Sequence, residues 1–274
     1  MSLYITSLNS GSNGNCYYVG NNEEAVLIDV GISYREVEKR MINLGLQLSI
    51  VKAIFISHEH TDHISGVEVL AKKHNLPVYI TPPVLHNSRL KIAENLIRTF
   101  KTDEPVAIGK LLVTPFTKKH DAIDPYSFIV EGSGVKIGVI TDIGIACKQV
   151  IHYFKQCHAA FLESNYDEQL LEQGGYPERL KKRISGGKGH LSNAEALDLF
   201  LSHRSPYLTH LFLSHLSQNN NRTELVKELF NANANGVNII VASRHSETPV
   251  YKISNTENDV VLKKNEPVQM NLFG

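Results

Sequence analysis

Four potential metal ligands lie within six positions of the stretch "FISHEHTDHISG": His58, His60, Asp62 and His63. They follow an apolar run, 52–57, that predicts a buried strand. Imidazole and carboxylate groups suit Zn²⁺, and also Mn²⁺ or Fe. The spacing excludes the helical zinc motif, whose histidines stand at i and i+4. On an extended or turning backbone, the first two histidines can point to one side while the last two ligands are carried round the turn. This division predicts two metal ions.

Further ligands must come from distant parts of the chain, because four are too few for two metals. Four apolar runs each deliver a polar, metal-competent side chain at or just past their end: Asp29, His58, Asp142 and His215. Sites in α/β proteins gather at strand ends, where loops are held by a rigid scaffold. The candidate additional ligands are therefore His120, Asp142 and His215, although a lone histidine is more often a surface or core residue.

The elements that must position these residues alternate between short β-branched runs and helical patterns. Strands are predicted at 24–30, 52–57, 76–81, 110–116, 127–131, 135–141, 159–164, 210–215 and 237–243. Helices are predicted after capping boxes at Ser33/Glu36 and Ser192/Glu195, over 223–236, and from about Ile64 to Asn75. The Gly-rich stretch 172–190 is expected to be irregular or an insertion. We expect one α/β domain over residues 1–274.

The composition excludes several classes of protein. Lys+Arg and Asp+Glu are both 28, so the overall charge gives no argument for nucleic-acid binding, although a local patch could still bind. No apolar run approaches the roughly 18–20 residues that a membrane span needs, and the first residues lack the pattern of a signal peptide. Three widely spaced cysteines suit reduced thiols. We therefore expect a cytoplasmic protein without a membrane partner.

These motifs occur in the order found in the metallo-β-lactamase superfamily, which the sequence resembles over essentially its whole length. The residues that carry the resemblance are Asp29, the His58–His63 cluster, His120, Asp142 and His215. Within the superfamily the chain is similar to the YycJ-like (WalJ-like) hydrolases. The stretches that carry this second similarity are "GSNGNCYYV", "HDAIDPYSF", "TDIG", "ESNYDEQLLEQGGYPERLKKRI", "GHLSN" and "LFLSHLSQNNN".

The resemblance implies a four-layer αββα sandwich with the site at one edge of the two sheets. It implies that one metal is held by His58, His60 and His120, and the other by Asp62, His63 and His215. Asp142 would bridge the two ions, and Asp29 would orient the cluster, as acids commonly do beside metal-bound histidines. Many true lactamases have a cysteine at the position of Asp142, whereas the phosphodiesterase and nuclease branches have aspartate. This departure argues against β-lactam or thioester substrates.

The implied reaction is hydrolysis of a phosphodiester by a hydroxide that bridges two metals. The candidate catalytic residues are Asp62 and His190. His190 would protonate the leaving oxygen, because ribonuclease Z-like members have a histidine in a similar "GH" motif. Alternatively, His190 caps the helix that begins at Ser192. Asp121 is expected only to orient His120.

The substrate implied by the resemblance is DNA, cleaved by a 5′-3′ exonuclease-like activity. A basic run close to His190 would hold backbone phosphates through Arg179, Lys181, Lys182, Arg183 and Lys188. Such a run is more often a solvated face. The alternatives are a hydrolase of a small cyclic or linear phosphodiester and a non-catalytic, metal-stabilised binding protein. The second is disfavoured because all seven expected ligand positions are filled.

Overall fold

The computed structural model describes residues 2–255, so the ends of the expected domain, residue 1 and residues 256–274, lie outside the described part. Two sheets of seven strands each form the centre of the molecule in these residues. The first sheet has the spatial order β14 (Tyr251–Ile253), β1 (Leu3–Asn9), β2 (Cys16–Gly20), β3 (Ala25–Ile28), β4 (Val51–Phe55), β5 (Val78–Tyr79) and β6 (Ile97–Arg98). The second has the order β13 (Asn238–Val241), β12 (His210–Ser214), β11 (Ala159–Glu163), β10 (Val135–Ile140), β9 (Tyr126–Gly132), β8 (Leu111–Thr117) and β7 (Val106–Ile108).

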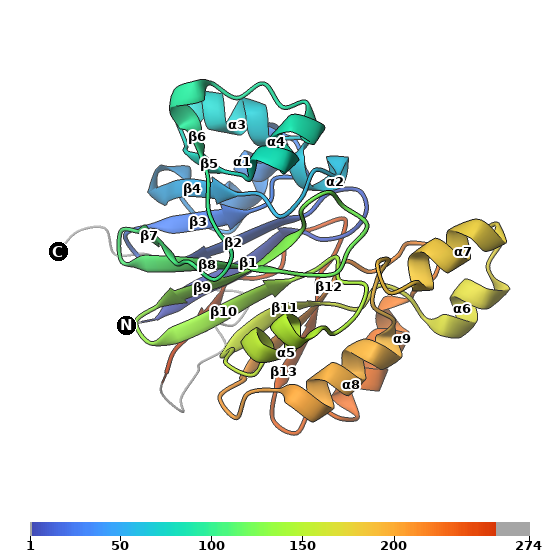
Figure 1. Ribbon diagram of the computed structural model, residues 1–274. Helices are drawn as coiled ribbons and strands as arrows, with labels where there is room; N and C mark the ends of the chain where they lie inside the picture. The colour runs from blue at the N-terminus through green and yellow to red at the C-terminus, as the bar shows by residue number, and fades with distance from the viewer. Residues whose placement is uncertain (1, 256–274) are drawn as a thin grey trace.

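Helices cover the outer faces of the two sheets, except for a helical segment over residues 168–185 that projects from the sandwich (Figure 1). Those between β3 and β6 are α1 (Tyr34–Asn43), α2 (Thr61–Ile64), α3 (Val67–His74) and α4 (Pro82–Ser88). The later ones are α5 (Lys148–Phe154), α6 (Glu168–Gln173), α7 (Glu178–Ser185), α8 (Asn193–His203) and α9 (Thr223–Asn231). The layers are therefore helix, sheet, sheet and helix, and the predicted αββα fold is confirmed. No helix within residues 2–255 is long and apolar enough to cross a membrane.

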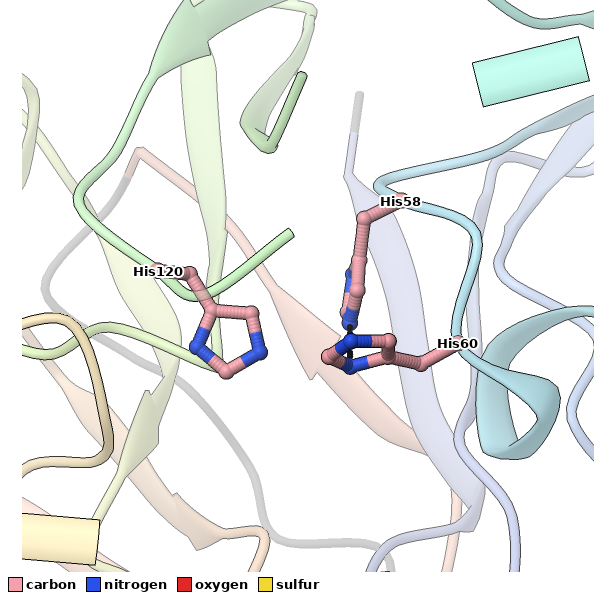
Figure 2. A group of neighbouring side chains, drawn as sticks. All are labelled: His58, His60 and His120. Carbon is pink, nitrogen blue, oxygen red and sulfur yellow. Dashed lines mark hydrogen bonds between the residues drawn. The ribbon is translucent and has the colours of Figure 1, made fainter. Parts of the chain in front are cut away.

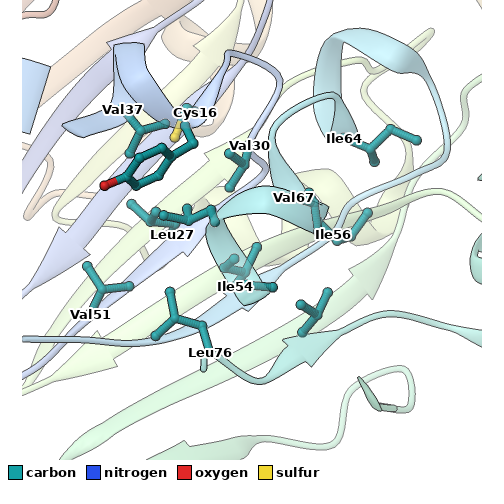
Figure 3. Packing of buried hydrophobic residues seen from close by; sticks show 14 of the residues in the cluster. Cys16, Leu27, Val30, Val37, Val51, Ile54, Ile56, Ile64, Val67 and Leu76 are labelled. Atoms are coloured by element: carbon teal, nitrogen blue, oxygen red, sulfur yellow. The ribbon is translucent and has the colours of Figure 1, made fainter. Parts of the chain in front are cut away.

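Alternation along the inner strands produces separate cores on the two faces of a sheet. In β3, Ala25 and Leu27 face the core beneath α1 and α3, whereas Val26 and Ile28 face the core between the sheets. Figure 3 shows the first of these cores. Both faces of β3 are apolar because both are covered. Each such side chain contributes about 1.5–3 kcal/mol when it is fully buried. The result is a rigid support for the strand ends.

The predicted helices form with two differences. Ser33 and Ser192 cap α1 and α8 as expected, although only Ser192 completes a capping box. The helix expected from about Ile64 begins earlier, as α2, and is interrupted at Ser65 and Gly66 before α3. A Cβ at Gly66 would lie 2.0 Å from the carbonyl oxygen of Ile32, so the chain passes too close for a side chain there.

Two further expectations need correction. The stretch 172–190 is largely helical, because α7 lies within it, and the Gly-rich motifs only flank that helix. The strands β1, β2, β6, β7 and β14 were not expected. Polar residues such as Thr6 and Ser7 interrupt the apolar pattern of β1, but they are buried and their backbone and side chains bond to Thr248. Hydrogen bonds to a distant residue thus stabilise β1 where its own sequence lacks a regular apolar pattern.

Candidate metal centre

The ends of the parallel strands bring the predicted ligands to one edge of the sandwich. Asp29 follows β3, Asp142 follows β10 and His215 follows β12. All three have left-handed backbone conformations, with φ values of 59°, 54° and 58°. Such conformations are uncommon for residues other than glycine and cost roughly 1–3 kcal/mol each. The surrounding structure therefore holds these side chains in place at an energetic cost, as is common at functional sites.

One cluster consists of His58, His60 and His120 (Figure 2). Nε2 of His58 lies 3.1 Å from Nδ1 of His60. The His120 ring centroid lies 4.9 Å and 5.2 Å from those of the other two rings. The Nδ1–H of His120 donates to the carbonyl oxygen of Gly189 over 2.9 Å, which leaves its Nε2 free to act as a ligand. The three side chains can hold one ion.

A second cluster consists of Asp62, His63 and His215. The Oδ2 atom of Asp62 lies 3.5 Å from Nε2 of His63 and 3.5 Å from Nε2 of His215. Asp62 and His63 lie in the single turn of α2, which explains how residues adjacent in sequence reach a different cluster from His58 and His60.

Asp142 lies between the two clusters. One carboxylate oxygen, Oδ2, is 3.3 Å from Nε2 of His63, and the other, Oδ1, is 3.4 Å from Nδ1 of His215 and 3.9 Å from Nε2 of His120. The same carboxylate can also form a ligand group with His58 and His63. This position is compatible with the bridging role that the resemblance predicts for Asp142.

The donor set fits a divalent cation. Three buried atoms of the predicted ligands make no hydrogen bond within the described residues: Nε2 of His120, Nε2 of His215 and Oδ2 of Asp142. A buried polar atom without a partner costs about 1–3 kcal/mol, and a cation would satisfy all three.

The pKa values of two histidines also show that the site favours positive charge. Burial alone would lower the pKa of His63, but the carboxylates of Asp142 and Asp29 raise it well above its usual range. Burial likewise opposes the effect of Asp142 and Asp62 on His215, whose pKa is nevertheless raised to about 10. The site therefore attracts positive charge.

Asp29 lies behind the histidines. Its Oδ2 atom is 2.7 Å from Nδ1 of His63 and accepts a hydrogen bond of 2.7 Å from the hydroxyl of Ser57. That hydroxyl is also 2.8 Å from Nδ1 of His58. Asp29 thus orients one ligand from each cluster, directly and through Ser57. A carboxylate bonded to the distal nitrogen fixes the tautomer and direction of a ligating ring.

Glu163 is a buried site residue that the sequence reasoning missed. Its Oε1 atom is 2.9 Å from Nδ1 of His215 and 2.8 Å from Nδ1 of His190, and its Oε2 atom accepts from the backbone N–H of Ile143 over 2.7 Å. Burial would raise the pKa of its carboxyl, but His190 and His215 lower it to about 2. The signal was present, since Glu163 is the second-last residue of the predicted strand 159–164, as Asp29 is of the predicted strand 24–30.

Asn15 and Lys118 were also missed. The amide nitrogen of Asn15 is 3.2 Å from Oδ2 of Asp62 and 3.1 Å from Nε2 of His63. The ammonium of Lys118 donates to the carbonyl oxygen of Thr141 over 2.8 Å and is buried, which lowers the pKa of the lysine. Asn15 lies in the stretch "GSNGNCYYV", but a single amide or lysine in a loop or strand has many ordinary roles, so the sequence did not identify either as a site residue.

We expect Glu163→Gln to weaken metal binding or activity by about 10–100-fold, the usual effect of removing an acid that orients a ligating histidine. The amide would turn a nitrogen or an uncharged oxygen towards His215 and could no longer fix its ring. Metal titration followed by calorimetry measures the change. The control is Glu131→Gln, a partly exposed residue in β9. Equal affinity in both variants would contradict this orienting role.

Gly31 allows α2 to approach the first sheet. A Cβ at this residue would lie 1.6 Å from the carbonyl oxygen of Asp62, which already accepts a hydrogen bond of 2.7 Å from the backbone N–H of Asn15. We expect Gly31→Ala to lower the free energy of unfolding by roughly 1–3 kcal/mol, as overpacking does, and to displace Asp62. Urea unfolding tests this. Gly175→Ala is the control, because a Cβ there meets nothing within 4 Å; equal effects would argue against the close approach.

The structure also places His190 and Asp121. Helix α8 is capped by Ser192, so the interpretation of His190 as the cap is wrong. The His190 ring instead lies beside both clusters, with its centroid 5.2 Å from those of His120 and His215. Asp121 Oδ1 is 3.4 Å from Nε2 of His120, and its Oδ2 accepts from Nε of Arg183 over 2.5 Å.

The basic residues lie on and after α7, which projects with α6 from the sandwich (Figure 1). Two of them are engaged locally: Arg183 with Asp121, and Lys181 with Glu178 at 3.6 Å. Arg179, Lys182 and Lys188 are exposed and form no ion pair with any residue in 2–255.

Comparisons with a family model, with known sequences and with solved structures all find proteins of the β-lactamase superfamily or its fold. Residues 24–212 match the model of the β-lactamase superfamily domain. The chain is 33% identical over 235 residues to exodeoxyribonuclease YycJ of Bacillus anthracis, which covers 83% of this chain and 87% of that protein. It is 29% identical over 223 residues to exodeoxyribonuclease WalJ of Streptococcus pneumoniae, with coverages of 80% and 83%. The crystal structure of the metallo-β-lactamase fold protein YhfI from Bacillus subtilis superposes with a TM-score of 0.71 at 17% identity, over 92% of this chain and 100% of that one.

Proposed function

This chain belongs to the metallo-β-lactamase superfamily, and we propose that it is a metal-dependent phosphodiesterase that degrades DNA as an exonuclease. The observation that carries the proposal is the position of Asp142 between two three-residue ligand clusters. The names of the YycJ and WalJ relatives supply the reaction class. The cytoplasm is the proposed location, in keeping with three cysteines that form no disulfide within the described residues.

We propose two divalent ions, Zn²⁺ or Mn²⁺, with Fe also compatible with the ligands. His58, His60 and His120 would hold one ion, Asp62, His63 and His215 the other, and Asp142 both. When bound, such ions supply Lewis acidity, which activates water and stabilises negative charge on a phosphoryl group. Asp62 is both a ligand and a candidate catalytic residue in this proposal.

His190 is proposed as the proton donor to the leaving oxygen. Its Nδ1–H donates to Glu163 over 2.8 Å, which fixes the ring beside the clusters, and the side chain is 23% exposed, so substrate can reach it. A general acid must be held within hydrogen-bond reach of the atom that it protonates. The hydrogen bond to Glu163 supports the role of proton donor, because a freely rotating surface histidine would not be held in one position.

The α7 segment is proposed as the contact to the DNA backbone. A cavity of about 150 Å³ lies between this helix and the site and is lined in part by Arg183, Leu180 and His190. Exposed Arg179, Lys182 and Lys188 lie on or just beyond the same helix. Phosphate contacts of this kind make binding depend strongly on salt. Arg183 and Lys181 would contact DNA only by exchanging their present partners.

The test is shortening of end-labelled double-stranded DNA by metal-stripped protein reconstituted with Mn²⁺ or Zn²⁺, beside an Asp62→Ala/His63→Ala variant. Stepwise loss from one end, absent in the variant, would support the exonuclease proposal and identify the polarity. A generic small phosphodiester is assayed in parallel. If only this compound is hydrolysed, the second candidate function, a small-phosphodiester hydrolase, replaces the first.

A further inference from the structure

A polar pocket of about 190 Å³ lies beside His215, outside both ligand clusters. It opens between the loop after β12 and the loop after β13. Its lining includes Ser10, Ser217, Gln218, Asn221, Ser243 and Arg244. The volume equals that of about six water molecules at roughly 30 Å³ each. A compact polar group could therefore enter.

The chemistry of the lining favours an anion. Among residues 2–255, no aspartate or glutamate lines the pocket, whereas hydroxyl, amide and guanidinium groups do. Arginine presents five N–H donors in a planar fork that matches phosphate oxygens. The cavity beside α7 differs in this respect, because Asp121 lines it.

Arg244 is held in place by hydrogen bonds to Leu216 and Gln218, which also line the pocket. Its guanidinium donates to the carbonyl oxygen of Leu216 over 2.8 Å and to Oε1 of Gln218 over 3.1 Å. A longer contact of 3.5 Å reaches the hydroxyl of Ser12. A Cβ at Gly11, where φ is +148°, would lie 3.0 Å from Nη2, so the glycine leaves room for the guanidinium. Three contacts leave two of the five donors for a ligand.

The pocket continues the line of strand ends that forms the metal centre. Four neighbouring parallel strands each have a polar side chain at or shortly after their end: Asp142 after β10, Glu163 at the end of β11, His215 after β12 and Arg244 after β13. Neighbouring strands lie about 4.8 Å apart, so Arg244 stands one strand position beyond His215. Ser10 connects the two, since it lines the pocket and its hydroxyl accepts from the backbone N–H of His215 over 2.7 Å.

We propose that the Arg244 pocket binds a phosphate group of the DNA strand, next to the phosphodiester that is cleaved. This inference rests on the proposed function. The phosphate is either the monoester at a strand end or an internal diester, because both present anionic oxygens to the guanidinium. Such a contact to a non-reacting phosphate provides binding that is equal in the ground and transition states, and therefore acts on KM.

The experiment compares metal-loaded wild type with Arg244→Gln, Arg244→Lys and the control Lys155→Gln. Lys155 is exposed and follows α5, near the start of β11 and thus towards the opposite edge of the sheet. The substrates are one duplex with phosphate or hydroxyl at its 5′ ends, and one with either group at its 3′ ends. We expect Arg244→Gln to raise KM about tenfold, the factor that corresponds to one lost charged hydrogen bond, with kcat nearly unchanged. Arg244→Lys should recover part of the loss, and Lys155→Gln should match wild type.

The substrates identify the source of the phosphate. A rise confined to a phosphorylated end indicates the terminal monoester, and an equal rise on every substrate indicates an internal diester. Unchanged KM on all of them, or a fall in kcat alone, overturns the inference while the proposed function stands. If wild type leaves DNA intact, the proposed function fails, and thermal stabilisation by thymidine monophosphate then tests the pocket. Loss of that stabilisation in Arg244→Gln would support an anion site, and equal stabilisation would refute it.

Discussion

Asp142→Asn should lose at least about 10³-fold of the metal-dependent cleavage rate. The charge of this carboxylate faces both clusters, with His63, His215 and His120 within 3.3–3.9 Å. An amide keeps the shape but loses the charge and one acceptor. Electrostatic stabilisation by metals contributes several kcal/mol to such reactions, and each 1.36 kcal/mol is tenfold in rate. Metal content and single-turnover cleavage of labelled DNA measure the loss.

The matched control is Asp198→Asn, an exposed residue on α8 whose carboxylate accepts only from the hydroxyl of Ser202 among the hydrogen bonds described. It should retain wild-type metal content and rate. Thermal unfolding of both variants separates loss of function from loss of fold. An Asp142→Asn protein that keeps the metal content of wild type and turns over within tenfold of it would contradict the proposed bridging role of the carboxylate.

Metal-stripped protein should lose stability as the pH rises from neutral to about 10, whereas metal-loaded protein should not. The pKa of His215 is raised to about 10 in the folded chain, and that of His63 is also raised, by neighbouring carboxylates that outweigh burial. A raised folded pKa stabilises the fold fully below the unfolded value, about 6.5, and this stabilisation is lost as the pH passes through the folded value. The change should be on the order of a few kcal/mol, or roughly 5–10 °C in Tm. Bound metal requires neutral imidazoles, so the loaded protein has no such proton to lose.

At acid pH, the stability of the metal-stripped protein should fall as the pH falls. Burial lowers the pKa of His120 to about 4, so its contribution to stability is lost as the pH falls from about 6.5 through 4. Stripped protein should therefore be most stable near neutral pH. Scanning calorimetry from pH 4 to 10, with and without Zn²⁺, measures both limbs. His215→Gln should reduce the loss of stability of the stripped protein between neutral pH and pH 10. His152→Gln, at an exposed position on α5, should leave that loss unchanged. Parallel pH profiles for stripped and loaded protein would refute the explanation.

The sequence alone determined the local chemistry of the site and the class of fold. His58, His60, Asp62 and His63 are close in space because they are close in sequence, so their spacing was sufficient. Inner strands such as β3 and β12 were predictable because burial on both faces leaves a mostly apolar run. Strands such as β1 and β5 were missed or shortened, because their pairing depends on distant partners rather than on their own residues.

The tertiary structure decided which distant side chains meet. Asp29, Asp142 and His215 converge because the carboxyl ends of parallel strands lie at one edge, and their left-handed conformations turn them there. Glu163 and Arg244 join them by the same geometry, although neither belongs to the set of ligands expected from the sequence. Hydrogen bonds and cavities between segments more than a hundred residues apart depend on strand order and register. Those are set by the packing of the whole sandwich, which no short stretch of sequence encodes.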